Sequence, residues 1–374
     1  MLRFLSGGES HGKGVTVILD GYPAGVSISI AKINKELSRR QVGYGRGVRM
    51  QIESDSVEIL SGLKDNRTFG SPITLFIKNR DYTIDRLDTI LAPRPGHADI
   101  AGGLKYNIKD LRLILERASA RETVARVAAG SLCKQFLLDF GISVFSHVLS
   151  IGSVRVNSSK VSLEKIPYLA EKSELRCVSV SAEKKMKALI NEAQKSGDSL
   201  GGVFEVIALE VPVGLGSYAQ WDMRFDALVG AAILSIPAIK AVEIGDGVEN
   251  SSKPGSKVQD EIYYKKISGF YRKTNRCGGV EGGITNGEPL VVKGYMKPIA
   301  TLRRPLASVN IISKKVSKAS KERADICAVP AAGVVAESMI AYIIMRSFLD
   351  KFGSDNLNDI KNNYKNYIKR LERY

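Results

Sequence analysis

The sequence predicts an α+β protein built in layers, with helices between antiparallel sheets. Several stretches carry apolar residues at alternate positions, which is typical of strands with one buried face. Longer stretches repeat apolar residues every three or four positions, which is typical of helices with a buried face. No glycine-rich dinucleotide-binding signature accompanies this alternation, so a doubly wound parallel sheet is not indicated.

The predicted strands have apolar side chains at alternate positions over much of their length. The first group lies in the amino-terminal third and the second group lies beyond residue 140. They cover residues 14–21, 49–62, 72–79, 142–156, 175–181, 201–216 and 290–298.

Three predicted helices lie among these strands. Residues 29–41 form a short amphipathic segment, and residues 181–197 have a basic face and stop at Gly197. Residues 221–245 are apolar on most sides before Pro237, which indicates a buried helix.

Two further helices are the clearest in the chain. One lies within residues 116–141, with Ser119 and Glu122 as a capping box and Gly141 as its stop. Its small residues would let another backbone approach closely; they are Ala125, Ala128, Ala129 and Gly130. The other covers 330–353, from Pro330 to Gly353. Their endings, FLLDFG and FLDKFG, are similar and hint at a duplicated half.

The composition is that of an ordinary soluble protein and predicts a cytoplasmic location. Of the 374 residues 44% are hydrophobic and 25% charged, and no apolar run indicates a membrane span. The four cysteines are scattered without a C-x-x-C pair, so we expect reduced core thiols. With only three histidines, far apart, we expect no metal site.

The charge balance predicts an anionic partner. Lys and Arg number 55 against 39 Asp and Glu, which gives a formal charge of +16. Nucleic acid is one candidate, but its recognition motifs are absent. Arginines instead occur beside glycines and isolated histidines, which favours a small phosphorylated ligand; a generally basic surface is the alternative.

The stretch SGGESHGKGV, residues 6–15, begins like a phosphate-binding P-loop. Gly14 stands where that motif needs a Ser or Thr hydroxyl for Mg²⁺, so we reject a nucleotide site. His11 lies between glycines that let a ligand approach the backbone. We interpret the stretch as a proton-transfer loop, with a surface-turn histidine as the alternative.

Three other stretches carry polar residues that local folding does not require. Arg39, Arg40, Arg46 and Arg49 surround a glycine-rich loop and suit bidentate capture of phosphate or carboxylate, unless the loop is simply solvated. His97 follows a Pro-Gly turn and is a second candidate for proton transfer. His147 lies in an alternating run and is interpreted as a half-buried strand residue without a role.

Anion binding is also predicted at the start of the capped helix. Arg117 and Ser119 lie where free N–H groups favour an anion. Glu116, Arg121 and Arg126 could be helix ion pairs, and Asp325 could pair with Arg323. The residues alone therefore predict a phosphate-handling enzyme that uses histidine acid catalysis.

Longer motifs make the chain resemble the chorismate synthase family. They occur in the family's order from residue 7 to about residue 340, and they are GESHGKG, GYGRGVRMQIESD, GSPITLFIKNRD, RPGHAD, ERASARETVARVAAG, GDSLGGVFEV, VPVGLG, KAVEIGDG, NRCGGVEGGITNGEPL, KPIATL and VPAAGVVAESM.

The resemblance implies a carbon–oxygen lyase acting on phosphates. The reaction would be the anti-1,4-elimination that converts 5-enolpyruvylshikimate-3-phosphate to chorismate, the seventh step of the shikimate pathway. It would need reduced FMN without net redox change. The implied fold is a β-α-β sandwich with pseudo-twofold symmetry, assembled as a homotetramer, with neither nucleic acid nor membrane as a partner.

The resemblance also assigns roles to residues. His11 would protonate the departing phosphate, His97 would hold and protonate the reduced flavin, and Asp325 would assist proton removal. Arg40 and Arg46 match positions assigned to NADPH, a candidate reductant, and with Arg39 and Arg49 we expect them to grip substrate anions. FMN contacts would come from Arg117, Ala118, Ser119, Pro237, Ala238, Gly282, Lys297, Pro298, Ile299, Ala300, Thr301 and Arg323.

Two features lie outside the family pattern. Ala324 stands where the family often has histidine. We expect residues 1–353 to form one catalytic domain and residues 354–374 a basic amphipathic tail. Apolar residues recur in the tail at helical spacing, so it would dock on the body or on a neighbouring subunit.

Overall fold

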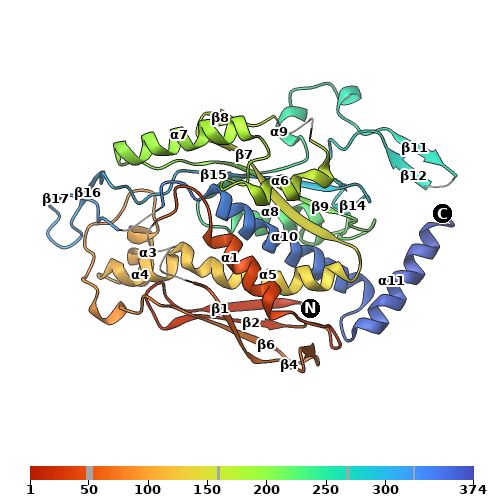
Figure 1. Ribbon diagram of the computed structural model, residues 1–374, viewed down its shortest axis with the longest axis horizontal. Coiled ribbons are helices and arrows are strands. Elements are labelled where there is room, and N and C mark those ends of the chain that lie inside the picture. Colours follow the sequence, from red (N-terminus) through yellow and green to blue (C-terminus); the bar gives the residue numbers. More distant parts are fainter. Residues whose placement is uncertain (48–53, 158–160, 267–268, 323–324) are drawn as a thin grey trace.

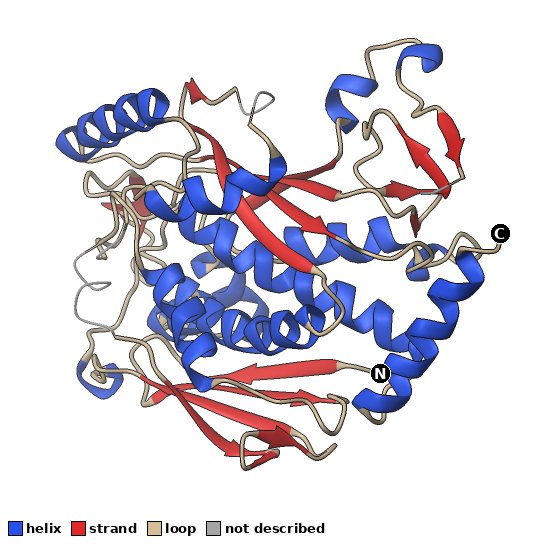
Figure 2. Ribbon diagram, turned by 45° about the vertical axis from the view of Figure 1, so that its right-hand side comes forward, coloured by secondary structure: helices blue, strands red, loops and turns tan. Residues whose placement is uncertain are grey.

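The computed structural model describes residues 1–47, 54–157, 161–266, 269–322 and 325–374. It is a sandwich in which helices lie between two antiparallel sheets (Figure 1). The layered α+β prediction is therefore confirmed. The view in Figure 2 shows the same order, with one sheet on each side of the helical layer.

The first sheet comes from the amino-terminal part of the chain and has the order β1-β2-β6-β3. Its strands are β1 (Arg3–Gly7), β2 (Gly14–Asp20), β6 (Ile73–Lys78) and β3 (Val57–Ser61). Val15, Val17 and Leu19 alternate along β2 and are buried. This alternation gives the sheet one face against the helices. The part of the predicted strand 49–62 before residue 54 lies outside the described residues.

The second sheet has the order β10-β15-β9-β7-β8. Its strands are β10 (Ile239–Ile244), β15 (Leu290–Met296), β9 (Gly202–Leu209), β7 (Ser143–Ile151) and β8 (Val154–Arg155). The predicted segments 142–156, 201–216 and 290–298 all contribute strands. His147 is confirmed as a strand residue of β7, but it is fully buried, with Nε2 2.9 Å from the Glu205 carboxylate.

The middle layer contains α1 (Ile30–Gln41), α5 (Thr123–Leu138), α8 (Phe225–Leu234) and α10 (Val329–Phe352). The close approach predicted for the small residues of α5 is confirmed, since a Cβ on Gly130 would lie 2.3 Å from Ser338 Cβ of α10. The two helices with similar endings are thus the pair that packs together.

Among the described residues, α10 is the one helix that is long and apolar enough by composition to cross a bilayer. Most of its apolar stretch is buried inside the protein. Its apolar surface therefore serves the core between the two sheets.

Shorter elements surround these layers. The helices are α3 (Asp99–Tyr106), α4 (Leu111–Ala118), α6 (Ile166–Lys172), α7 (Val180–Ser196) and α9 (Gly247–Asn250), with 3₁₀ turns at Ile84–Arg86, Ala120–Glu122, Leu163–Lys165, Trp221–Met223 and Gly255–Lys257. The small hairpins pair β4 (Leu63–Lys64) with β5 (Arg67–Thr68), β11 (Ile262–Lys265) with β12 (Gly269–Arg272), β13 (Val280–Glu281) with β14 (Ile284–Thr285), and β16 (Ala307–Val309) with β17 (Val316–Lys318).

Three local predictions were wrong. Residues 175–181 form no strand and lead into α7. The helix predicted over 221–245 ends at Leu234, and the chain continues as strand β10. Ser119 does not begin the long helix, because its hydroxyl caps the 3₁₀ turn by accepting the Arg121 N–H, and α5 starts only at Thr123.

The carboxyl-terminal tail forms α11 (Leu357–Leu371) and docks on the body of its own chain. Ile360 is fully buried, and the Tyr364 ring lies 5.2 Å from the Phe348 ring. We expected the tail to dock either on the body of its own chain or on a neighbouring subunit, and the structure shows docking on its own body. The division into a catalytic domain and a tail at residue 353 stays a prediction.

Candidate active site

The loop between β1 and β2 carries His11, as predicted. Glu116, on α4, holds this residue twice: its carboxylate accepts the His11 backbone N–H at 2.6 Å and lies 2.8 Å from the imidazole Nδ1. The Glu116 side chain is fully buried. Burial opposes its ionisation, yet hydrogen bonds from His11 hold the pKa of this carboxyl below its usual value. On its other side the imidazole Nε2 lies 3.9 Å from the Asp81 carboxylate, so the ring stands between two acidic side chains, with Nδ1 held by Glu116.

His97 has a matching arrangement. Its Nδ1 lies 2.6 Å from the carboxylate of Asp99, whose side chain is fully buried. Arg94 donates to the same carboxylate through Nε and Nη2 and to the Thr301 hydroxyl through Nη1 at 2.7 Å. Burial raises the pKa of Asp99, but hydrogen bonds from His97 and Arg94 outweigh it and hold that pKa well below the usual range.

A third candidate, Asp325, lies against the glycine-rich arginine loop. Its Oδ2 pairs with Arg46 Nη1 at 2.7 Å, and its Oδ1 accepts the Gly47 N–H at 2.6 Å. The carboxylate is thus held by the loop that carries Arg46. Arg323 and Arg49, which we also predicted as ligands, lie outside the described residues.

The arginine cluster consists of Arg40, Arg46 and Arg121. Arg40 and Arg121 are buried and share one carboxylate, Asp55, at 2.7 and 2.6 Å. Three buried N–H atoms of this cluster find no acceptor among the residues that the structure describes: Arg40 Nε, Arg46 Nε and Arg121 Nη2.

The electrostatics of the cluster favour an added anion. Burial lowers the pKa of Arg40, and repulsion from Arg121 and Arg46 adds to this, although Asp55 opposes it. A buried donor without an acceptor is costly. An anion that accepted from these nitrogens would remove both the repulsion and the unsatisfied donors.

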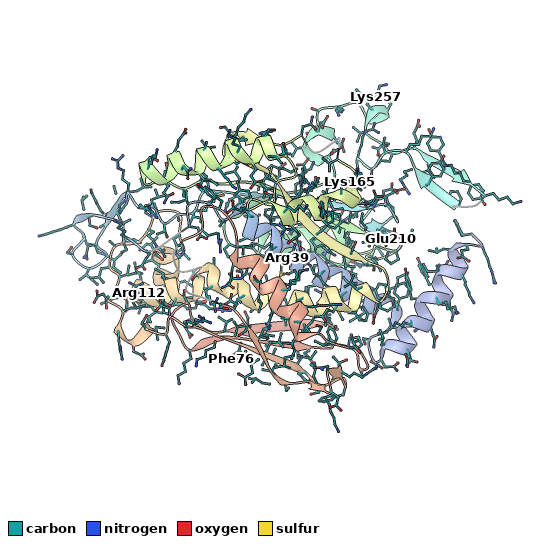
Figure 3. All side chains as sticks on the ribbon, in the orientation of Figure 1. Arg39, Phe76, Arg112, Lys165, Glu210 and Lys257 are labelled. Carbon is teal, nitrogen blue, oxygen red and sulfur yellow. The ribbon has the colours of Figure 1, made fainter. Side chains whose placement is uncertain are left out.

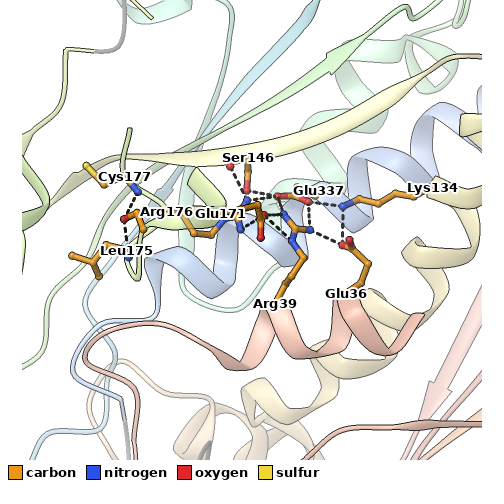
Figure 4. A network of polar contacts seen from close by, with 10 residues as sticks. Glu36, Arg39, Lys134, Ser146, Glu171, Leu175, Arg176, Cys177 and Glu337 are labelled. Carbon is orange, nitrogen blue, oxygen red and sulfur yellow. Dashed lines mark hydrogen bonds and ion pairs between the residues drawn. The ribbon is translucent and has the colours of Figure 1, made fainter. Parts of the chain in front are cut away.

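Arg39 belongs to a different network, in spite of its place beside Arg40. Its guanidinium donates to Glu36, Glu171 and Glu337 at 2.6–3.0 Å (Figure 4). Figure 3 shows Arg39 in the interior, near the middle of the molecule. Because three carboxylates already surround its guanidinium, Arg39 is not a member of the arginine cluster.

The centre of this second network is Glu337 of α10, which is fully buried. Arg176, Lys134 and the Ser146 hydroxyl also donate to its carboxylate. Burial raises its pKa, but the charges of Lys134, Arg39 and Arg176 outweigh burial and hold the pKa well below the usual value. The network joins α1, α5, α10 and β7, so its role is to hold the layers together.

Three of the residues predicted to contact FMN, Arg117, Ala118 and Pro237, line one pocket of about 440 Å³, together with Ser6 and Ser235. Arg117 is at the carboxyl end of α4, not at the start of a helix as predicted, and donates to Ser6 and to the Gly8 carbonyl. Ser119 donates to the Ser10 hydroxyl at 3.1 Å.

The segment 297–301 connects this pocket to His97. The Ala238 carbonyl accepts the Lys297 N–H at 3.0 Å, and Lys297 Nζ donates to the Gly96 carbonyl at 2.7 Å. Ala238 holds φ at +66°, a conformation that L-residues adopt at some cost and that often marks a functional site. The Ile299 carbonyl accepts from the Ser199 hydroxyl, and Ala300 lies beside Gly96.

Gly282 stands apart from this group. Its carbonyl accepts from Arg224, directly before the first residue of α8, whereas Pro237 follows the other end of that helix. Gly282 is not among the residues that line the pocket, and its assignment as an FMN contact stays a prediction.

The sequence analysis missed the residues that hydrogen-bond to the candidate histidines and those that share the charge of the arginine cluster. Glu116 and Arg121 were interpreted as helix ion pairs, although Glu122–Arg126 is the pair with that function, at 3.0 Å. Asp99 was not selected, although its place two residues after His97 was a usable signal. Arg94 was missed as well.

Known proteins similar to this chain agree with the geometry. A family model described as chorismate synthase matches residues 2–349. The chain is 54% identical to "Chorismate synthase" of Sulfurihydrogenibium sp. (strain YO3AOP1) and 49% identical to that of Carboxydothermus hydrogenoformans, in both cases over 100% of each chain. A crystal structure of chorismate synthase covers 100% of this chain and 99% of its own, with a TM-score of 0.84 and 44% identity.

The sandwich, the two histidine–carboxylate pairs and these similarities define an enzyme of the lyase class that acts on a small molecule. The chain belongs to the chorismate synthase family, whose members serve aromatic amino-acid biosynthesis.

Proposed function

We propose that the chain converts 5-enolpyruvylshikimate-3-phosphate to chorismate and inorganic phosphate by an anti-1,4-elimination that requires reduced FMN, the seventh step of the shikimate pathway. The observation that carries this proposal is the presence of His11, whose Nδ1 is held by buried Glu116, together with an arginine cluster whose buried N–H groups include three without an acceptor among the described residues. A phosphorylated dicarboxylate supplies the anions that such a cluster lacks.

In this proposal the chain's own residues act at both ends of the elimination. The carbon–oxygen bond to phosphate breaks and its electron pair leaves with the phosphate oxygen, while His11 delivers a proton from Nε2 to that oxygen. Asp325, which pairs with Arg46 Nη1 at 2.7 Å, assists removal of the ring proton on the opposite side. A positioned general acid typically contributes ~10²–10⁴-fold to the rate.

The pocket lined by Arg117, Ala118 and Pro237 fits a bound flavin. Its volume of about 440 Å³ lies within the ~300–1,000 Å³ usual for cofactor sites. Arg117 and Lys297 supply cationic groups for a phosphate. The His97 ring is held by Asp99 at Nδ1 and by Arg94, whose Nη2 lies 2.9 Å from Nδ1 and 3.4 Å from Nε2. Reduced FMN held by these residues would supply an electron and take it back within the same turnover, so the reaction would have no net redox change.

Other parts of the proposal rest on the family resemblance. They are use of NADPH as a reductant, a homotetramer and a cytoplasmic location.

Binding of nucleic acid, the alternative raised by the charge of +16, is not favoured by the arginines at the candidate site. Arg39, Arg40 and Arg121 face buried carboxylates and do not form a surface stripe.

The decisive test is an anaerobic phosphate-release assay with the enolpyruvyl substrate. Reduced FMN should support release and oxidised FMN should not, and a parallel sample with NADPH as the only reductant tests direct flavin reduction. His11→Ala and His97→Ala should each lower turnover by ~10²-fold or more. His147→Ala is the matched control, because it removes a buried histidine that we assign no role. Near-parental rates in both variants would overturn the proton-transfer roles, and absence of release by the parent would overturn the function.

A further inference from the structure

A single segment after β6 holds the His11 loop. The carbonyls of residues 9 to 13 all accept hydrogen bonds from residues 79–84. The Asn79 side-chain amide donates to the carbonyls of Glu9, Ser10 and Gly12 at 3.1, 3.2 and 2.8 Å. The Asn79 backbone N–H donates to the Lys13 carbonyl, and the N–H groups of residues 83 and 84 donate to the His11 carbonyl.

The same side chain also contacts the arginine cluster. Asn79 is 2% exposed, and its Oδ1 accepts from Arg121 Nε at 2.8 Å. Arg121 Nη1 donates to the Asp55 carboxylate, which also accepts from Arg40. One amide therefore joins the loop that carries the proton donor to the residues that would hold the anion.

Asparagine is suited to this position by its chemistry. It offers an N–H₂ group for the loop carbonyls and a carbonyl oxygen for the guanidinium. Aspartate would keep the acceptor and lose the donors, and alanine would lose both. The two functions of Asn79 can therefore be separated by substitution.

We propose that Asn79 is a positioning residue for the reaction: its amide fixes the His11 loop, and its oxygen fixes Arg121, so that the proton donor and the anion site keep one relative geometry. This inference rests on the proposed function. Displacement of a catalytic group by about 1 Å can cost ~10²-fold in rate.

The test compares Asn79→Asp, Asn79→Ala and Asn34→Ala in the anaerobic phosphate-release assay. Asn79→Asp should lower kcat by ~10²-fold and leave KM within about threefold, because Arg121 keeps its acceptor. Asn79→Ala should lower kcat similarly and raise KM by about tenfold, since Arg121 also loses a partner. Asn34 accepts the Val57 N–H at 2.9 Å and is the matched control, expected to leave kcat unchanged.

Hydrogen exchange supplies a readout that does not need turnover. In the parent, the Asn79 side-chain amide protons should be strongly protected. In both Asn79 variants, exchange should accelerate in residues 9–13 and 79–84 and stay unchanged elsewhere. Fast exchange of the parental amide, or Asn79 variants with kcat within threefold of an active parent, would overturn the inference. A parent that releases no phosphate would overturn the proposed function, while the exchange data would still decide whether Asn79 holds the loop.

Discussion

Replacement of Glu116 by glutamine tests the histidine–carboxylate pair most directly. The carboxylate accepts from the His11 backbone N–H and lies against Nδ1 at 2.8 Å. Glutamine keeps one acceptor and presents an N–H₂ donor to the other position. The imidazole must then turn away or present an unprotonated Nδ1, which leaves Nε2 in the wrong state or orientation for the proposed proton transfer.

The magnitude follows from the hydrogen bond that is lost. A hydrogen bond to a charged group is worth ~1.5–3 kcal/mol. If this stabilisation acts in the transition state, the tenfold change in rate for each ~1.36 kcal/mol gives a loss in kcat of about 10- to 160-fold. KM should change little, because Glu116 itself is fully buried and cannot reach the substrate.

The assay is anaerobic phosphate release with reduced FMN, with kcat and KM determined separately. Glu205→Gln is the matched control, since Glu205 also faces a histidine ring, that of His147, at 2.9 Å. The control should keep the parental kcat. A Glu116→Gln enzyme with kcat within about threefold of the parent would refute the orienting role, as would an equal loss in the control.

The remaining predictions concern packing, charge and substrate binding. Gly130→Ala should lower the free energy of unfolding by ~1–3 kcal/mol in denaturant titrations, because the added methyl group would lie 2.3 Å from Ser338 Cβ; an unchanged midpoint would argue against this close contact. Glu337 has a lowered pKa in the folded state, so its stabilisation is complete above pH 4.5, its ordinary value, and is lost as the pH falls below it. Thermal unfolding from pH 7 to 3 should therefore show a smaller acid-induced fall in Tm for Glu337→Gln than for the parent, and equal slopes would contradict this. Arg121→Lys should raise KM by about tenfold in phosphate-release kinetics, because lysine cannot reproduce the planar set of donors, and an unchanged KM would remove Arg121 from the anion site. Ile360→Ala should cost ~2–5 kcal/mol of stability with kcat unchanged, and a neutral effect would mean that α11 is not docked on its own body.

Much of the fold could be predicted from local pattern. Alternation along 14–21, 72–79 and 201–216 identified the central strands, helical spacing identified α1 and α7, and Pro330 and Gly353 marked the ends of α10. Segments such as β2 and α1 have one buried face, so their periodicity records burial directly, whereas α10 is buried on nearly all sides. The pattern failed at residues 175–181, which contact β7 through the Arg176 carbonyl and the Val148 N–H but form no strand of their own. It also failed at 221–245, where Pro237 separates a helix from a strand.

The sequence by itself also selected the candidate side chains, since histidines between glycines and arginines in glycine-rich loops are unusual within a stable fold. What it could not determine was their partners. His11 and Glu116 are 105 positions apart, and only the packing of α4 beside the β1–β2 loop brings them together. Arg39 and Arg40 are adjacent, yet consecutive helical residues point ~100° apart. One therefore enters the Glu337 network and the other the arginine cluster, because the layers on the two sides of α1 present different carboxylates.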